Sequence, residues 1–272
     1  MPKNTTTLAF THPERPSIPA PSRLWTWLPW LHLALSVAIA VAIAVVVYTL
    51  WVPPPLHRMV GGLELFGWIV GVDVVCGPLL TWLLIKPHKT RRALAVDCTL
   101  IVCVQLGALI YGVYTLAHAR PLAIVHEVDR FRVLSYSDVP ETELGTAPAW
   151  FQPWGMQAPM LVGLRATKDL SEKMASLEAA LQGVDAAQHT ARWQEYGLSH
   201  AQVLARARPL AALRQHYPLD TNQIDAAVLE AGLTPEQALW LPVTSRRSNG
   251  WIALVEPSYG RIVGYLPLDG FF

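Results

Sequence analysis

A long apolar run with one acid at its middle limits how this chain can fold. Residues 63–85 read LELFGWIVGVDVVCGPLLTWLLI, and the acid is Asp73. About 20 apolar residues at 1.5 Å per residue cover a hydrocarbon core of roughly 30 Å. The run therefore predicts a membrane-spanning helix with Asp73 near its midplane. It leads directly into a basic turn that contains Lys86, Lys89, Arg91 and Arg92.

Two further runs predict two more spans. Residues 24–52 have an Ala/Val/Ile centre with aromatic residues at both ends, a pattern typical of the two membrane interfaces. Residues 93–117 form the third run. We therefore expect a three-helix transmembrane region over 24–118, with spans at about 28–52, 63–85 and 93–117. A composition that is 52% hydrophobic and only 15% charged fits an integral membrane protein with a soluble part.

The basic residues predict the orientation. Cytoplasmic loops are enriched in Lys and Arg. Four of these residues crowd the second loop, whereas the first loop holds only Arg58. We expect an inner-membrane protein with its amino terminus in the cytoplasm and its carboxy-terminal domain in the periplasm. The proline-rich segment 1–23 cannot bury enough apolar surface to fold, and it predicts a disordered cytoplasmic tail.

Polar and small residues in the spans suggest contacts between helices. If helices two and three leave the short turn symmetrically, Asp73 lies level with Gln105, and the two could share a hydrogen bond. That pair could serve only to stabilise the packing of the chain's own helices, or the acid could bind a partner's transmembrane helix or a proton. Gly77 and Pro78 predict a kink beside the acid, because proline lacks an amide proton.

The spacing of Gly67 and Gly71 predicts a close helix contact of the GxxxG type. We expect this contact within the chain more than with a partner, although three helices leave outer faces free. Cys76, Cys98 and Cys103 fit buried small hydrophobic residues better than a redox site. Asp97 could interact with a helix dipole or with Arg91 or Arg92.

The segment 119–272 is long enough for one domain with its own core. Residues 124–136 mix apolar and polar positions as a strand does, and residues 170–181 have apolar residues at helical spacing. Two further helices are expected after Ser199 and from Thr221 to Gly232, and a short one at Thr234. Three carboxy-terminal strands, at 241–244, 251–255 and 261–266, are separated by hairpin signals. The expected fold class is α+β.

Motifs of catalysis or metal binding are missing from the sequence: it has no GxSxG, HExxH, glycine-rich phosphate loop or Cys/His cluster. We therefore expect neither enzymatic activity nor a cofactor or metal. The net charge of +1 gives no sign of nucleic-acid binding.

Tryptophans of the domain leave two hypotheses open. They could line a groove for a small molecule, which would make the protein an extracytoplasmic sensor or binding module, or they could pack in the core. The tryptophans concerned are Trp150, Trp154, Trp193, Trp240 and Trp251. A proton pathway through Asp73 is disfavoured, because the spans hold a single midplane acid.

Several stretches together resemble the type IV pilin accessory protein family. The resemblance runs from about residue 25 to the end, and Cys76 stands where the family pattern has an aliphatic residue. The stretches that carry it are VDVVCGPLLT at 72–81 with Lys86 and Pro87, residues 97–106 and 111–115, ARP at 119–121 with VDRF at 128–131, and GYLPL at 264–268.

The resemblance implies an inner-membrane helper for type IV pilus biogenesis that acts as a pilin chaperone or modulates pilus assembly. It carries across no catalytic residues. The partners it implies are the type IV pilin, through both its membrane helix and its periplasmic head, and possible contacts with the assembly machinery. The intramembrane platform would then be formed by Asp73, Gln105, Gly67, Gly71, Gly77 and Pro78.

Overall fold

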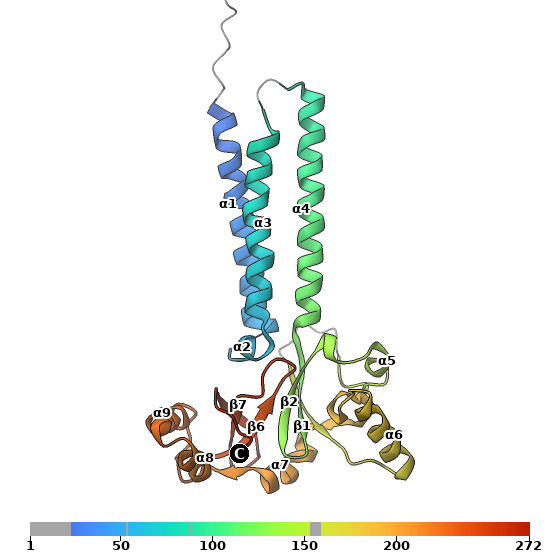
Figure 1. Cartoon of the computed structure of the whole chain (residues 1–272), viewed down its shortest axis with the longest axis vertical. Coiled ribbons are helices and arrows are strands. Elements are labelled where there is room, and N and C mark those ends of the chain that lie inside the picture. The colour runs from blue at the N-terminus through green and yellow to red at the C-terminus, as the bar shows by residue number, and fades with distance from the viewer. Residues whose placement is uncertain (1–22, 53, 87–88, 153–158) are drawn as a thin grey trace, which may run out of the picture.

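Three long helices lie side by side, and a domain of sheet and short helices sits at one end of them (Figure 1). The computed structural model describes residues 23–52, 54–86, 89–152 and 159–272. The long helices are α1 (Arg23–Val46), which continues into the π-helix η1 (Val47–Trp51), α3 (Gly62–Leu84) and α4 (Arg91–Ala119).

Each long helix is apolar enough and long enough to cross a membrane. The three predicted spans are therefore confirmed. Except for Arg23, the tail predicted at 1–23 lies outside the described residues.

The carboxy-terminal part is an α+β domain, as predicted. Among the described residues its sheet has eight strands in the order β4-β3-β1-β2-β6-β7-β8, with β5 paired to β6. The strands pair antiparallel except at β1/β3 and β2/β6, which are parallel. The bounds are β1 Pro121–Glu127, β2 Arg130–Ser135, β3 Met160–Leu164, β4 Trp193–Glu195, β5 Arg208–Pro209, β6 Leu239–Thr244, β7 Trp251–Val255 and β8 Ile262–Leu266.

Local sequence signals found most of these elements and missed others. The three carboxy-terminal strands are confirmed as β6, β7 and β8, but the single strand expected at 124–136 is a hairpin. Its turn has Val128 at a φ of 55°, a conformation uncommon for a β-branched residue. Beyond the spans and the π-helix, the α-helices are α2 (Leu56–Val60), α5 (Glu141–Leu144), α6 (Leu170–Leu181), α7 (His200–Arg206), α8 (Leu210–His216) and α9 (Thr221–Glu230).

The helix expected at Thr234 is wrong, because this segment forms turns that lead into β6. The helices expected at 170–181, after Ser199 and from Thr221 are confirmed as α6, α7 and α9. Gly183 and Gly232 follow α6 and α9 with φ of 86° and 76°. Glycine adopts this left-handed conformation at no steric cost, and it is a common way to end a helix.

The two faces of the sheet have different covers. Along β7, Trp251, Ala253 and Val255 face one side, whereas Ile252 and Leu254 face the other, as the alternation of a strand requires. The second side packs against α8 and α9. The first side packs against the ends of the membrane helices, through a cluster that includes Val52, Leu56, Met59 and Leu116.

The connection between α1 and α3 is therefore part of the core of the domain. Leu56 and Met59 of α2 are 4% and 1% exposed. The Ser245 hydroxyl donates a buried hydrogen bond of 2.7 Å to the carbonyl of Met59. At the edge of this junction, Arg247 and Glu64 form an ion pair of 3.1 Å. The domain thus packs against the helices through a shared core and is not merely linked to them by the chain.

Replacing Leu56 by Ala tests this shared core. A buried Leu→Ala change costs about 2–5 kcal/mol through lost burial and a residual cavity. We expect the midpoint of thermal unfolding, followed by tryptophan fluorescence of the protein in detergent, to fall by about 5–15 °C. Leu219→Ala is the matched control, because Leu219 is 97% exposed. Equal midpoints for the two variants would contradict the shared core.

Candidate partner-binding surface in the membrane region

Helix α3 is the centre of the membrane region. It contacts α1 and α4 more extensively than these two contact each other. One face of α3 points into the bundle, where Asp73 borders a void of about 20 Å³ between the three helices. This is roughly the room for one water molecule. The buried Oδ1 of Asp73 has no hydrogen-bond partner among the described residues.

Gln105 lies one helical turn away from the depth that the sequence suggested. A Cβ atom built on Gly77 would come within 2.0 Å of Gln105 Nε2, so the amide rests against this glycine. No hydrogen bond joins Asp73 to Gln105, although the structure describes both residues, and that expectation is wrong. The reason is that α4 begins well beyond the end of α3 (Figure 1), so the two helices do not leave the turn symmetrically.

A polar cluster that sequence analysis missed lies beside Gln105. His32 of α1 and Thr81 of α3 are joined by a hydrogen bond of 2.5 Å between Nδ1 and Oγ1. The Thr81 hydroxyl is also 2.9 Å from the carbonyl of Gly77, to which it can donate. The signal was available, because an ionisable residue within a span, such as His32, is rare and usually has a protein partner.

His32 and Thr81 also line an apolar groove. The groove has a volume of about 260 Å³ and lies at the end of the bundle farther from the domain. His32 and Thr81 are its polar lining, and the rest is apolar or sulfur-bearing: Leu28, Leu31, Leu35, Ile85, Cys98, Ile101 and Val102.

Gly67 and Gly71 face away from the other helices. Apart from its own helix backbone, no described atom lies within 4 Å of a Cβ built on either glycine. The expectation that this GxxxG pair packs within the chain is therefore wrong. Its neighbours Trp68 and Val75 are also exposed, at 76% and 62%. The predicted site residues thus divide between an inward set, Asp73, Gly77 and Gln105, and an outward set, Gly67 and Gly71.

Pro78 lies within α3, which continues to Leu84, and is half-buried. Cys76 and Cys103 are exposed and Cys98 is partly exposed, so the expectation of buried cysteines is wrong for the first two. Nothing about their sequence spacing distinguishes a lipid-facing position from a buried one.

Lys89 of the basic turn forms a close ion pair with Asp97. Lys89 Nζ lies 2.5 Å from Asp97 Oδ2, so the partner of this acid is neither Arg91 nor Arg92. Lys86, Arg91 and Arg92 are exposed. Thr90 caps α4 by accepting a hydrogen bond from the amide of Ala93.

The tryptophans of the domain favour the core over a groove. Trp193, Trp240 and Trp251 are buried, Trp150 is 38% exposed, and Trp154 lies outside the described residues. Trp193 and Trp240 donate their ring N–H groups to backbone carbonyls. The part of the chain that the structure describes contains no cluster of three or more His, Cys, Asp or Glu side chains that could hold a metal.

Comparisons with known proteins give a family for this chain. It is 34% identical over 244 residues to the fimbrial assembly protein of serogroup I from Dichelobacter nodosus. The aligned region covers 89% of this chain and 94% of that protein. The chain belongs to the fimbrial assembly protein family. A second member, from serogroup E1, is 34% identical over 242 residues with the same coverage. A third, from serogroups C1 and C2, is 41% identical over 117 residues, or 43% of this chain and 89% of that protein.

The resemblance to the type IV pilin accessory family is thereby confirmed. No family model and no solved structure matches the chain. As a member of the fimbrial assembly protein family it is a membrane protein whose three spanning helices carry an α+β domain.

Gly77→Leu tests the inward packing of this fimbrial assembly protein. The added side chain would collide with Gln105, and overpacking costs about 1–3 kcal/mol. We expect the unfolding midpoint in detergent to fall by roughly 2–10 °C. Gly107→Leu on α4 is the matched control, since the position of its Cβ is open. An unchanged midpoint for Gly77→Leu would show that Gln105 does not depend on this glycine.

Proposed function

We propose that this protein is a non-enzymatic accessory protein of type IV pilus biogenesis that binds pilin as a chaperone or modulates pilus assembly. The observation that carries the proposal is the outward glycine face of α3 in a member of the fimbrial assembly protein family. Small residues let helix backbones approach closely, and such contacts drive association in lipid, where the hydrophobic effect gives no advantage.

The occupant that fits this face is a single apolar helix. Gly67 and Gly71 leave a shallow surface, and the exposed Trp68 and Val75 border it. A pilin that waits in the membrane as one hydrophobic helix with a globular head would meet both parts of this chain. Its helix would pack on α3 and its head would face the α+β domain.

The inward residues have a supporting role in this proposal. Asp73, Gln105, Gly77 and Pro78 set how α3 sits against α1 and α4, and they thereby shape its outer face. The buried junction of α2 with the sheet then fixes the domain relative to that face.

The proposed orientation places the turn with Lys86, Lys89, Arg91 and Arg92 in the cytoplasm and the domain in the periplasm, in the inner membrane of a Gram-negative cell. Alkaline phosphatase fused after Phe272 should then be active, because this enzyme matures only outside the cytoplasm. An inactive fusion, with a fluorescent protein active at the same site, would reverse the orientation.

The pilin contact can be tested by photo-crosslinking in cells that make the native pilin. A photoreactive residue at Val75 is expected to capture pilin. Gly71→Leu should reduce this capture at least fivefold, because a leucine blocks the close approach, whereas Gly107→Leu should leave it unchanged. Both variants should accumulate to normal levels, since neither side chain meets another helix. If Gly71→Leu leaves the amount of crosslinked pilin unchanged, the proposed contact is refuted.

A further inference from the structure

The apolar stripe of α6 faces solvent. Leu170, Met174, Leu177 and Leu181 are 73%, 58%, 57% and 84% exposed. The sequence predicted an amphipathic helix here, and such a helix ordinarily turns its apolar face toward the core. In this protein the helix is turned the other way. Large apolar side chains in one exposed row mark a surface that is covered by something else.

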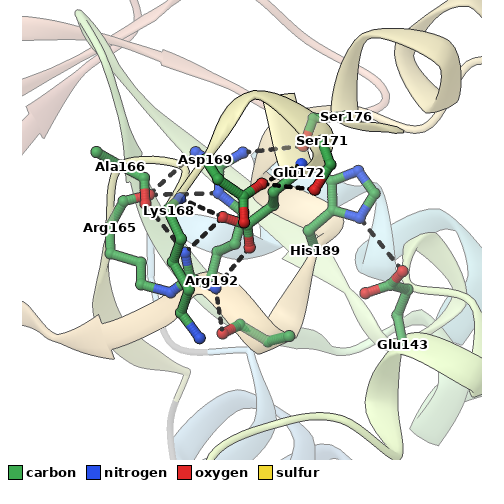
Figure 2. A network of polar contacts seen from close by, with 11 residues as sticks. Glu143, Arg165, Ala166, Lys168, Asp169, Ser171, Glu172, Ser176, His189 and Arg192 are labelled. Atoms are coloured by element: carbon green, nitrogen blue, oxygen red, sulfur yellow. Dashed lines mark hydrogen bonds and ion pairs between the residues drawn. The ribbon is translucent and has the colours of Figure 1, made fainter. Parts of the chain in front are cut away.

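The opposite face of α6 attaches it to the domain. Glu172, Ser176 and Ala179 are its half-buried residues. At 3.6 residues per turn they lie on the side opposite the stripe. Figure 2 shows the attachment, in which Arg165 donates two hydrogen bonds, of 2.9 and 2.7 Å, to the two carboxylate oxygens of Glu172. A paired arrangement of this kind fixes orientation as well as distance.

A second arginine completes the attachment. Arg192 is buried and donates to the carbonyl of Arg165 at 3.0 Å, and its Nη1 lies 3.5 Å from the hydroxyl of Ser176. The Arg165 guanidinium and the amide of Lys168 lower the pKa of Glu172 to about 2. A roll of α6 that buried the stripe would break the hydrogen bonds of Glu172 to Arg165 and of Ser176 to Arg192.

The spacing of the stripe makes it self-complementary. Its members are separated by four, three and four residues, so the pattern reads the same in both directions. This is the repeat of a coiled-coil seam. When two copies of α6 run antiparallel about a twofold axis, Leu170 comes level with the partner's Leu181, and Met174 with the partner's Leu177. A twofold interface requires this kind of self-matching surface.

The charges beside the stripe do not oppose the same axis. Lys173 and Glu178 flank the apolar row and are exposed. Lys173 and Glu178 lie on opposite flanks of the row, and the twofold axis sets each flank against the same flank of the partner, so each charge comes beside a small side chain rather than a like charge. The helix dipoles of an antiparallel pair also oppose each other favourably.

The area suits two copies held in one membrane. A buried Leu or Met side chain removes roughly 60–120 Å² of apolar surface from water, so eight such side chains bury about 500–1,000 Å². This is below the roughly 1,200 Å² of a stable interface between free proteins. Anchoring in a membrane raises the effective concentration, which lets a smaller interface suffice. Lipid is not the cover, because α6 lies away from the ends of the spanning helices (Figure 1).

We propose that α6 is the contact between two copies of this chain, which pair antiparallel through Leu170, Met174, Leu177 and Leu181. The proposal rests on the exposed stripe and its polar attachment, and it is independent of which pilus component the protein serves.

Disulfide crosslinking in native membranes tests the pairing. With Cys76, Cys98 and Cys103 replaced by Ala, the double variant Leu170→Cys/Leu181→Cys is expected to form a covalent dimer on oxidation. Each single variant should form none, because equivalent positions in an antiparallel pair lie about 16 Å apart at 1.5 Å per residue, too far for a disulfide. Dimers from the single variants, or none from the double variant, would overturn the proposal.

A substitution at the seam provides the second measurement. Leu177→Glu, added to the double-cysteine variant, should reduce the disulfide dimer at least fivefold, because it places a charge opposite Met174 of the partner subunit. Leu219→Glu is the matched control and should leave the dimer unchanged, since Leu219 is exposed on η6 (Pro218–Asp220), outside α6. Dimer that survives Leu177→Glu, or is lost equally in both variants, would refute the α6 contact.

Discussion

Burial of the first interhelical connection against the β-sheet is the interaction on which the rest of this structure depends. Leu56 and Met59 are buried in one cluster with Leu241 and Ala253 of the sheet, and Val203 of α7 belongs to the same cluster. Each part therefore completes the core of the other. A shift of α3 in the membrane must be felt at the sheet, because the helix begins directly after the buried α2. Packed interiors transmit such shifts, since they are as dense as organic crystals.

Sequence reasoning was most successful where a single physical requirement dominates. The hydrocarbon core demands about 20 apolar residues per helix, and all three spans were found. The last three strands were found because hairpin turns accept few residue types. Strands β3 and β4 were missed, because no hairpin turn marks them and β3 pairs with β1, which lies far from it in sequence.

The failures concern which neighbour a side chain meets. Gln105 was placed one helical turn too close to Asp73. The apolar periodicity of α3 and α4 does not determine how far the two helices are shifted along each other. The spacing in α6 correctly predicted an amphipathic helix, but periodicity reports an apolar face and not what covers it. Arg165 and Arg192 instead bind Glu172 and Ser176 on the polar face of the helix. His32 could have been found, since a histidine within a span is unusual.

The two outward surfaces use different physics. In lipid, Gly67 and Gly71 favour binding because they let the backbone of a second helix come close. Apolarity alone gives no advantage there, since the surrounding acyl chains are as apolar as any side chain. In water, the leucines of α6 offer apolar area, because water is what they avoid. One chain can therefore bind one partner within the membrane and another in the water outside it, and the two contacts do not compete.

The hydrogen bond from Ser245 to Met59 also bears on the order of folding. It joins residues 186 positions apart, and the strands that contact α2 come near the end of the chain. Contacts so distant in sequence form late, because closing a long loop costs entropy before any contact is gained. The first loop to be synthesised must therefore wait for the last strands. In the interval its apolar residues stay uncovered, and the sheet is complete only once the whole chain has emerged.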